Sequence, residues 1–431
     1  MALEAGLILL VIFFLLLFVG IPIAISLAIA SIIPLFMLFP FDDVAFATAQ
    51  KMFTGLDNFT LLALPFFVLS GVIMNNGGIA IRLINFAGLF VGKLPGSMAH
   101  TNVVGNMLFG SISGSSVAAA ASIGKVMAPL QEKNGYDRPF SAAVNIISAP
   151  TGLLIPPSGL LIVYSLASGG TSIAALFIAG YIPGMLWGLA TMVVAYFIAK
   201  RRRYPIADNI KFREALKVFL DAIPSLLLII IVIGGIVAGV FTATEGAAVA
   251  VAYSAILSMF YKSIALKDTP KILLETVEVT SIIMLLIAAS TVLSFVMSLT
   301  GIPGAISDSI LSNTTSLFMV LLLMNIVLLI IGTFMDITPA VLIFTPIFLP
   351  IVTSFGMDPV HFGIMMAFNL CIGNVTPPVG SALFVGSTVG KVSIEEVIKP
   401  LLPFYGAVVV VLLVVTYIPE ISLFLPKLLG L

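Results

Sequence analysis

The chain is a series of apolar runs separated by short polar breaks. A helix needs roughly 17–25 apolar residues to cross the hydrocarbon core of a membrane, and the runs meet that length. Strands that cross a membrane would instead alternate apolar and polar residues. The pattern therefore predicts an all-α integral membrane protein of about ten spanning helices. We place the spans near residues 3–20, 22–39, 58–76, 140–168, 172–199, 222–241, 244–261, 280–299, 361–388 and 400–419.

Two further apolar segments, 96–130 and 316–353, are interrupted at their centres by small polar residues. The first interruption is Gly110–Ser116, with the sequence GSISGSS, and the second is Gly332–Pro339, with the sequence GTFMDITP. A helix that crossed the membrane with such a centre would expose unsatisfied backbone groups to lipid. Each segment is therefore predicted to be a re-entrant hairpin whose tip is buried in protein.

The two halves of the chain repeat at a shift of 221 residues. Prolines and glycines fall in register: Pro129 with Pro350, Gly135 with Gly356, Gly152 with Gly373, Pro156 with Pro377, Pro157 with Pro378, and Gly159 with Gly380. A shared apolar composition would not align these residues, which mark helix breaks. The sequence therefore predicts an internal duplication, with one repeat over 1–205 and the other over 206–431.

The second repeat is predicted to be inverted relative to the first. Each half has five spans and one hairpin, which is an odd number of crossings. Lys133 and Arg138 follow the first hairpin, whereas the matching loop 354–360 has no Lys or Arg. Cytoplasmic loops are rich in Lys and Arg, so the two loops should lie on opposite sides of the membrane. Both termini are then expected outside.

Short amphipathic stretches join some of the spans. Lys211–Asp221 carries apolar residues on one helical face and charged residues on the other, and Lys262–Glu278 is interpreted in the same way. Such stretches lie flat in the headgroup region. We expect interfacial arm helices here, with a plain surface helix as the alternative. His361 and Trp187 are interpreted as interfacial or lipid-facing residues.

The spans 140–168 and 361–388 are each interrupted by a proline pair, Pro156–Pro157 and Pro377–Pro378. Adjacent prolines remove two backbone donors and free the carbonyls that they would have engaged. Carbonyl, hydroxyl and amide oxygens suit Na⁺, and the N-terminus of a resuming half-helix suits an anion. Inverted-repeat secondary transporters place their substrate and ion at paired broken helices. The alternative is a simple proline kink, which is less expected for two breaks in register.

Asp336 is the one acidic residue that we expect deep in the membrane. A buried charge there is costly and marks a functional site by default. The alternative is a tip residue that reaches water through a cavity. At the shift of 221 residues, Ser115 in the first tip is aligned with Asp336 in the second. Ser158 is aligned with Val379, so only the first break has a hydroxyl at this position, and this difference suggests that Ser158 contacts substrate.

Composition and charge exclude several function classes. The chain is 60% hydrophobic and 9% charged, with a net charge of zero, so it lacks the charged surface of a soluble or nucleic-acid-binding protein. The single cysteine, Cys371, and two histidines exclude a disulfide and a cysteine- or histidine-based metal site. Neither a zinc-protease motif nor a phosphate-binding loop is present, so an enzyme or primary pump is not expected. A secondary transporter is favoured, and a channel stays open as the alternative.

The motifs Gly110–Ser116, Ala149–Gly152 with Pro156–Ser158, and Asn374–Gly380 resemble the large membrane subunit of tripartite ATP-independent periplasmic (TRAP) transporters. The resemblance covers essentially the whole chain. It implies Na⁺-coupled uptake of an organic acid across the bacterial inner membrane, with no cofactor besides the coupling ion. It also implies two partners, a small four-helix membrane subunit, expected as a separate chain, and a periplasmic substrate-binding protein.

The resemblance further implies an elevator mechanism, in which hairpins and broken helices slide as a transport domain against a scaffold made by the remainder. The sialic-acid type is the nearest, followed by C4-dicarboxylates. Single-component divalent-anion/Na⁺ symporters share the architecture and are the alternative family. The implied substrate-binding residues are Ser115, Ser116, Ser158 and Asp336. The implied sodium-binding residues are Ser113, Gly114, Ser148, Thr151, Gly152, Gly332, Thr333, Thr338, Asn369, Gly373, Asn374 and Thr376.

Overall fold

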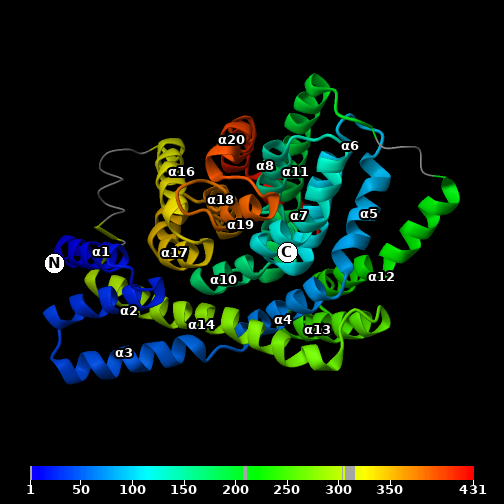
Figure 1. Ribbon diagram of the computed structural model, residues 1–431. Helices are drawn as coiled ribbons and strands as arrows, with labels where there is room; N and C mark the ends of the chain where they lie inside the picture. Colours follow the sequence, from blue (N-terminus) through cyan, green and yellow to red (C-terminus); the bar gives the residue numbers. More distant parts are fainter. Residues whose placement is uncertain (1, 207–210, 303, 306–315) are drawn as a thin grey trace.

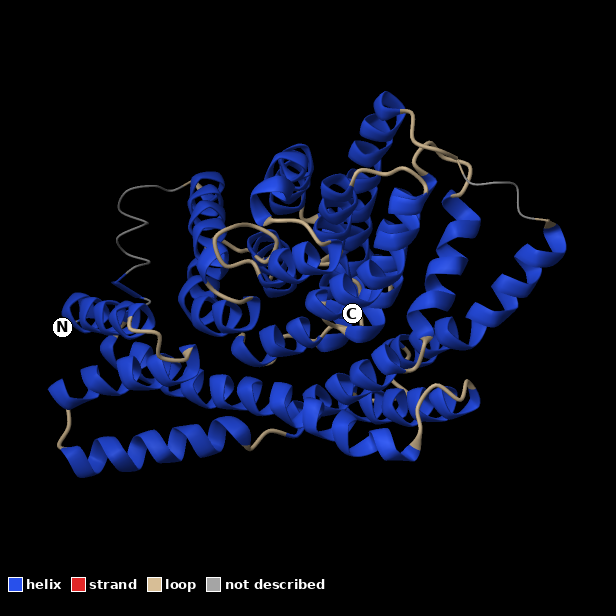
Figure 2. Ribbon diagram, in the orientation of Figure 1, coloured by secondary structure: helices blue, strands red, loops and turns tan. Residues whose placement is uncertain are grey.

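The computed structural model describes residues 2–206, 211–302, 304–305 and 316–431. The predicted boundary between the repeats adjoins residues 207–210, which lie outside the described residues. Within the described ranges the regular structure is entirely helical (Figure 2). Eight of the described helices are long and apolar enough to span a membrane, and a bent pair raises this number to nine. The predicted all-α membrane fold is confirmed.

The first half contains α1 (Ala2–Phe18), α2 (Ile23–Ile32), η1 (Ile33–Met37), α3 (Phe41–Leu56), η2 (Phe59–Leu62), α4 (Ala63–Asn76), α5 (Ile79–Val91), α6 (Ser97–Ser113), α7 (Ser116–Lys133), α8 (Arg138–Ser148), α9 (Thr151–Leu154), α10 (Gly159–Ala167) and α11 (Ile173–Arg202). The second half contains α12 (Phe212–Val237), α13 (Ala243–Phe260), η3 (Leu266–Asp268), α14 (Thr269–Thr300), α16 (Leu317–Phe334), α17 (Ile337–Ser354), α18 (Pro359–Gly373), α19 (Ser381–Gly390), α20 (Ile394–Tyr417) and α21 (Glu420–Leu428). The 3₁₀ turns η1 and η2 adjoin α2 and α4 directly.

The helices form two groups that face each other (Figure 1). In one group α14 runs beside α2, α3 and α4, and α4 packs closely on α13. The other group holds the hairpins and broken helices. Two long helices, α11 and α20, also pack on this second group: α11 contacts α6, and α20 contacts α8. The division predicted from the sequence assigns both helices to the scaffold. The long helix α11 therefore packs on the first hairpin, and α20 packs on the first broken helix.

Packed helix pairs lie at both predicted hairpin positions, and interrupted helices lie at both predicted breaks. α6 and α7 pack together as the first hairpin, and α16 and α17 pack together as the second. The first broken span bends by 51° between Leu154 and Gly159. Its counterpart in the second half is interrupted between α18 and α19. The turns at these positions follow from the glycine, serine and proline residues that the sequence places there.

The expected arm at Lys211–Asp221 is not a separate interfacial helix. Phe212–Val237 forms one continuous helix, α12, which includes Pro224. Arg82 on α5 forms an ion pair with Asp221 at 3.3 Å, and its guanidinium lies 3.6 Å from the centre of the Tyr261 ring. The amphipathic end of α12 is therefore held against α5, a short helix that the sequence analysis left unassigned.

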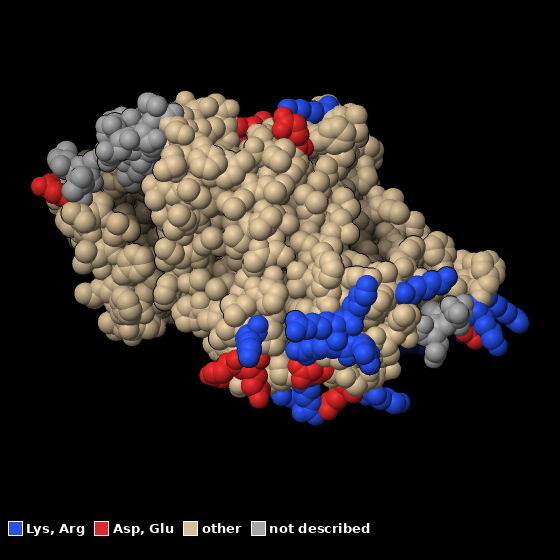
Figure 3. All heavy atoms as spheres, turned by 90° about the horizontal axis from the view of Figure 1, so that it is seen from above, with Lys and Arg blue, Asp and Glu red and all other residues tan. Residues whose placement is uncertain are grey.

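The surface charge agrees with a membrane protein. In Figure 3, Lys and Arg gather with Asp and Glu along one edge of the molecule, and a few charged residues lie at the opposite edge. The wide surface between these edges is uncharged. A band of this kind matches a hydrocarbon core bounded by two polar interfaces.

Trp187 and His361 are buried, so their interpretation as interfacial or lipid-facing residues is wrong. Trp187 has no exposed surface, and His361 is 2% exposed. The indole Nε1 of Trp187 donates a hydrogen bond of 2.7 Å to the carbonyl of Ile147, and its ring lies 4.7 Å from that of Phe368. Trp187 thus joins α11 to the broken helices of both halves, which a sequence pattern alone does not reveal.

Replacing Trp187 with Phe is expected to lower the free energy of unfolding by about 1–3 kcal/mol, because the buried Ile147 carbonyl loses its donor. The measurement is thermal unfolding of the purified chain in detergent. Phe197→Leu is the matched control, since Phe197 lies on the same helix and is 66% exposed. Equal unfolding midpoints for the two variants would contradict the assignment of Trp187 to the core.

Candidate ion and substrate site

Each hairpin tip is built by residues that end one helix and begin the next. α6 ends at Ser113, and its C-cap Gly114 has a φ of 61°, which is left-handed and favours glycine. Ser115 then caps α7, because its hydroxyl accepts a hydrogen bond of 3.2 Å from the amide of Ala118. In the second tip Asp336 occupies the same position, as the cap of α17. The sequence pairing of Ser115 with Asp336 is therefore a structural equivalence.

The backbone of each hairpin lies directly against a broken helix. A Cβ atom on Gly152 would be 2.2 Å from the Cα of Gly110, and a Cβ on Gly373 would be 2.4 Å from the carbonyl carbon of Gly332. Because the contacting atoms are backbone, side-chain movement cannot relieve such an overlap. Glycine at these positions brings the hairpin next to the break in both halves.

Asn374 connects the two tips across the halves of the chain. Its amide oxygen accepts a hydrogen bond of 2.9 Å from the Ser116 hydroxyl at the first tip. Its amide nitrogen donates to the hydroxyl of Ser381 at 2.7 Å and to the carboxylate of Asp336 at 3.5 Å. Ser116, Asn374 and Asp336, which the sequence analysis selected separately, therefore form one polar cluster.

Asp336 has an exposed side chain on the second tip. Its carboxylate makes no capping bond to α17 and instead lies 3.5 Å from the hydroxyl of Ser381. The carboxylate therefore lies beside the second break.

In the first half, buried polar side chains join the hairpin to the start of the break. The amide nitrogen of Asn106 on α6 donates to the Ser148 hydroxyl at 2.8 Å and to the Asn145 side-chain oxygen at 3.1 Å. Thr151 donates to the carbonyl of Ser148 at 2.6 Å. Asn106 Oδ1 is buried and has no hydrogen-bond partner within the described chain.

The second half repeats this arrangement with other residues. The amide nitrogen of Asn369 on α18 donates to the side-chain oxygen of Asn325 on α16 at 2.8 Å. Asn325 in turn donates to the hydroxyl of Thr416 at 3.2 Å. Asn369 Oδ1 is buried and unpartnered within the described ranges, as Asn106 Oδ1 is in the first half. In each half, therefore, an unpartnered amide oxygen lies one helical turn before a glycine of the close contact.

Four polar residues of these clusters were not predicted from the sequence: Asn106, Asn145, Asn325 and Ser381. A signal was available for Asn325, because it is the only polar residue between Leu317 and Ile331 in a strongly apolar run. A polar side chain in such a run is a functional candidate. Asn106 and Asn145 lie in more polar surroundings, where their residue types give no comparable signal.

The remaining predicted site residues occupy both tips and breaks. Ser158 is fully buried, and its hydroxyl donates to the carbonyl of Leu153 at 2.5 Å. Thr376 donates to the carbonyl of Ile372 at 2.6 Å, and Thr333 donates to that of Ile330 at 2.7 Å. Ser113 and Gly114 are half-buried at the first tip, and Thr338 is half-buried in the first turn of α17.

The two breaks differ in exposure. Residues Thr151–Ser158 of the first break are all buried, whereas Pro378 and Val379 of the second are exposed. The amide of Val379 donates to the carbonyl of Thr333 at 3.0 Å, which fastens the second break to its hairpin. Of the two breaks, therefore, only the second is exposed, and it lies beside Asp336.

Residues 10–421 match the family described as the DctM component of the tripartite ATP-independent periplasmic transporters. The chain belongs to this family. It is therefore a multi-pass bacterial inner-membrane protein with a transport role, and it is not an enzyme. The resemblance found in the sequence motifs is confirmed at the level of the large membrane subunit.

Relatives of this DctM-family chain match it over nearly their whole length. It is 54% identical to the uncharacterized protein YgiK of Salmonella typhimurium, over 96% of both chains. It is 42% identical to the C4-dicarboxylate TRAP transporter large permease protein DctM of Pseudomonas aeruginosa, over 91% of this chain and 92% of that one. It is 39% identical to the sialic acid TRAP transporter large permease protein SiaM of Vibrio cholerae, over 96% of both.

The fold also resembles a solved structure, that of the YdaH transporter of Alcanivorax borkumensis, which has an unusual topology. The TM-score is 0.67 at 12% identity, over 88% of this chain and 89% of that one. At this identity the likeness concerns the fold alone. It supports the overall fold of this DctM-family chain.

Proposed function

We propose that this chain uses a Na⁺ gradient to import an organic acid anion, which a periplasmic binding protein delivers. A small membrane subunit completes the system as a second partner. The observation that carries the proposal is the Asn374 cluster, because it brings both hairpin tips and the second break of a DctM-family chain to one place. Paired broken helices are where inverted-repeat transporters bind substrate and ion.

The buried amide oxygens support Na⁺ as the coupling ion. Asn106 Oδ1 and Asn369 Oδ1 are unpartnered among the described residues, and a buried polar atom is rarely left without a partner. Hard cations prefer oxygen ligands. Hydroxyl and carbonyl oxygens of the neighbouring breaks complete such a ligand set. We assign one ion position to each half, near Ser148–Gly152 and near Asn369–Thr376.

We place the substrate beside the tips, near Ser115, Ser116 and Asp336. The α10 and α19 half-helices begin at the breaks, and a helix N-terminus favours an anionic group. We further propose that the two repeats are inverted and that the hairpin group moves as an elevator against the layer of α14. Relatives named for sialic acid and for C4-dicarboxylates differ little in identity to this chain, so both acids are candidate substrates.

The test is uptake into proteoliposomes that contain this chain and its small membrane subunit. Labelled sialic acid and labelled succinate are supplied in parallel, with and without the binding protein, under an inward Na⁺ or K⁺ gradient. We expect uptake of one acid only when Na⁺ and the binding protein are both present. Uptake without the binding protein would indicate a single-component symporter. Flux independent of the Na⁺ gradient would indicate a channel, and either result would overturn the proposal.

A further inference from the structure

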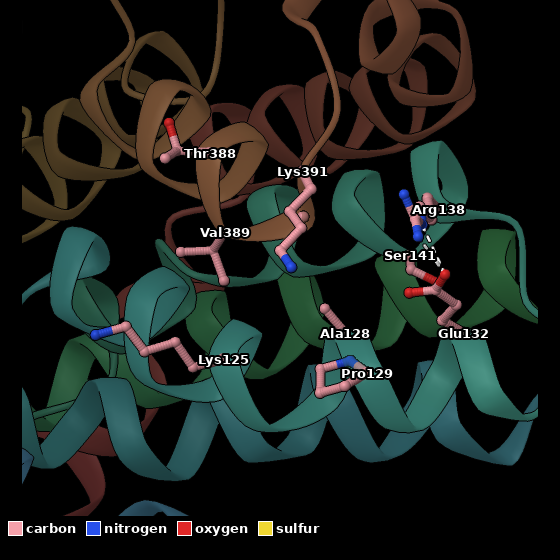
Figure 4. A pocket seen from close by; sticks show the side chains of 10 residues that line it. Lys125, Ala128, Pro129, Glu132, Arg138, Ser141, Thr388, Val389 and Lys391 are labelled. Atoms are coloured by element: carbon pink, nitrogen blue, oxygen red, sulfur yellow. Dashed lines mark hydrogen bonds and ion pairs between the residues drawn. The ribbon is translucent and has the colours of Figure 1, made fainter.

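A cavity of about 360 Å³ lies at the end of the first hairpin opposite its tip. Residues of α7 and α8 line one side, and the end of α19, from the other half of the chain, lines the other (Figure 4). Pro129 on this wall is thirteen residues after Ser116 along α7, which corresponds to about 20 Å of helix. The cavity is therefore separate from the Asn374 cluster.

Positive charge dominates the cavity. Lys125, Arg138 and Lys391 line it, and Glu132 is the only acidic residue among its lining residues. Glu132 forms an ion pair with Arg138. The ammonium groups of Lys125 and Lys391 form no ion pair with a carboxylate of the described chain, and both side chains are exposed. In Figure 4 Lys391 extends from the end of α19 into the cavity.

The wall of the cavity holds a buried polar atom with no partner. Ser141 is 5% exposed, and its hydroxyl has no hydrogen-bond partner among the described residues. A second cavity of about 10 Å³, large enough for one water, shares Ser141 and is also lined by Gln131 and Asn102. Gln131 Oε1 and Asn102 Nδ2 are likewise unpartnered within the described ranges. Buried polar atoms of this kind normally contact water or a ligand.

We propose that this cavity is a binding site for a small oxyanion, either a carboxylate or a phosphate. Lys391 and Lys125 would neutralise its charge, and the Ser141 hydroxyl would donate a hydrogen bond. The first turn of α8, which carries Arg138 and Ser141, adds the positive end of a helix. The volume lies within the range of small-molecule sites. A bound anion would join the two halves of the chain, since α8 and α19 both contact it.

Such an oxyanion has two sources, a released organic acid or the phosphate of a lipid headgroup. The test measures thermal unfolding of the purified full chain in detergent. Inorganic phosphate, glycerol phosphate and succinate each replace chloride at constant ionic strength. We expect a saturable rise in the unfolding midpoint. The strongest effect from glycerol phosphate would identify the headgroup source, and the strongest effect from succinate would identify the acid; either supports the site.

Lys391→Gln is expected to raise the half-saturating anion concentration roughly tenfold, because losing a hydrogen bond to a charged group weakens binding by about that factor. Lys262→Gln is the matched control, because Lys262 is also exposed and has the same φ of 53°.

Ser141→Ala should weaken anion binding severalfold without lowering the unfolding midpoint in chloride, since the Ser141 hydroxyl has no hydrogen-bond partner among the described residues to lose. Absence of a saturable effect in the wild type, or equal effects of Lys391→Gln and Lys262→Gln, would overturn the proposal.

Discussion

Uptake by a Gly152→Ala variant is expected to be lost. The added Cβ would lie 2.2 Å from the Cα and carbonyl carbon of Gly110, which is far inside van der Waals contact. Overpacking costs about 1–3 kcal/mol where side chains can adjust, and a backbone contact leaves only displacement of the hairpin. We therefore expect both a lower unfolding midpoint in detergent and no measurable uptake in proteoliposomes.

Gly373→Ala should behave in the same way, because its Cβ would lie 2.4 Å from the carbonyl carbon of Gly332. Gly406→Ala on α20 is the matched control, since a Cβ there meets no atom within 4 Å. Alanine in a helix interior is favoured over glycine by roughly 0.5–1 kcal/mol, so this control should unfold no earlier than the wild type. Wild-type uptake and unfolding by Gly152→Ala would show that hairpin and break do not approach so closely.

An Asp336→Asn variant is expected to fold normally but to take up substrate at least about tenfold more weakly at limiting Na⁺. The amide keeps the shape of the side chain and removes the negative charge beside Asn374 and Ser381. A hydrogen bond to a charged group contributes about 1.5–3 kcal/mol, which corresponds to one to two orders of magnitude in binding. The exposed side chain makes a folding defect unexpected.

The measurement for Asp336→Asn is initial uptake rate against Na⁺ concentration, together with the unfolding midpoint. We expect a higher half-saturating Na⁺ concentration and an unchanged midpoint. Asp43→Asn serves as the control, because Asp43 is an exposed acid in the first turn of α3, remote in sequence from both tips. A wild-type Na⁺ titration curve for Asp336→Asn would remove Asp336 from the proposed site.

The interruptions of the helices were predictable because their causes are local. Pro156–Pro157 and Pro377–Pro378 remove backbone donors wherever they occur in a helix. Gly114 and Ser115 carry the preferences of a helix end and a helix start, and the structure uses both. The repeat also located Asp336 correctly as the equivalent of Ser115. These features need no knowledge of what lies across the fold.

The arms and the buried aromatic residue were not predictable in this way. The amphipathic stretch Lys211–Asp221 suits either a separate interfacial helix or the start of a longer one. The stretch is the start of a longer helix in the structure, and its residue Asp221 contacts Arg82 and Tyr261. Tryptophan is a residue type that is typical of a membrane interface, yet Trp187 is buried and packs on Phe368. In both cases the partner lies far away in sequence.

Apolar length, proline pairs and glycine positions act through the local backbone. For this reason the amino-acid sequence alone predicted a membrane transporter with two hairpins and two broken helices. The packing of the helices brings Ser116 to Asn374, 258 residues away, and brings the hairpin backbones against the breaks at Gly152 and Gly373. It also decided which amide oxygens remain unpartnered. Hydrogen bonds and close contacts between distant segments depend on how the helices pack, and polar residue types alone do not specify that packing.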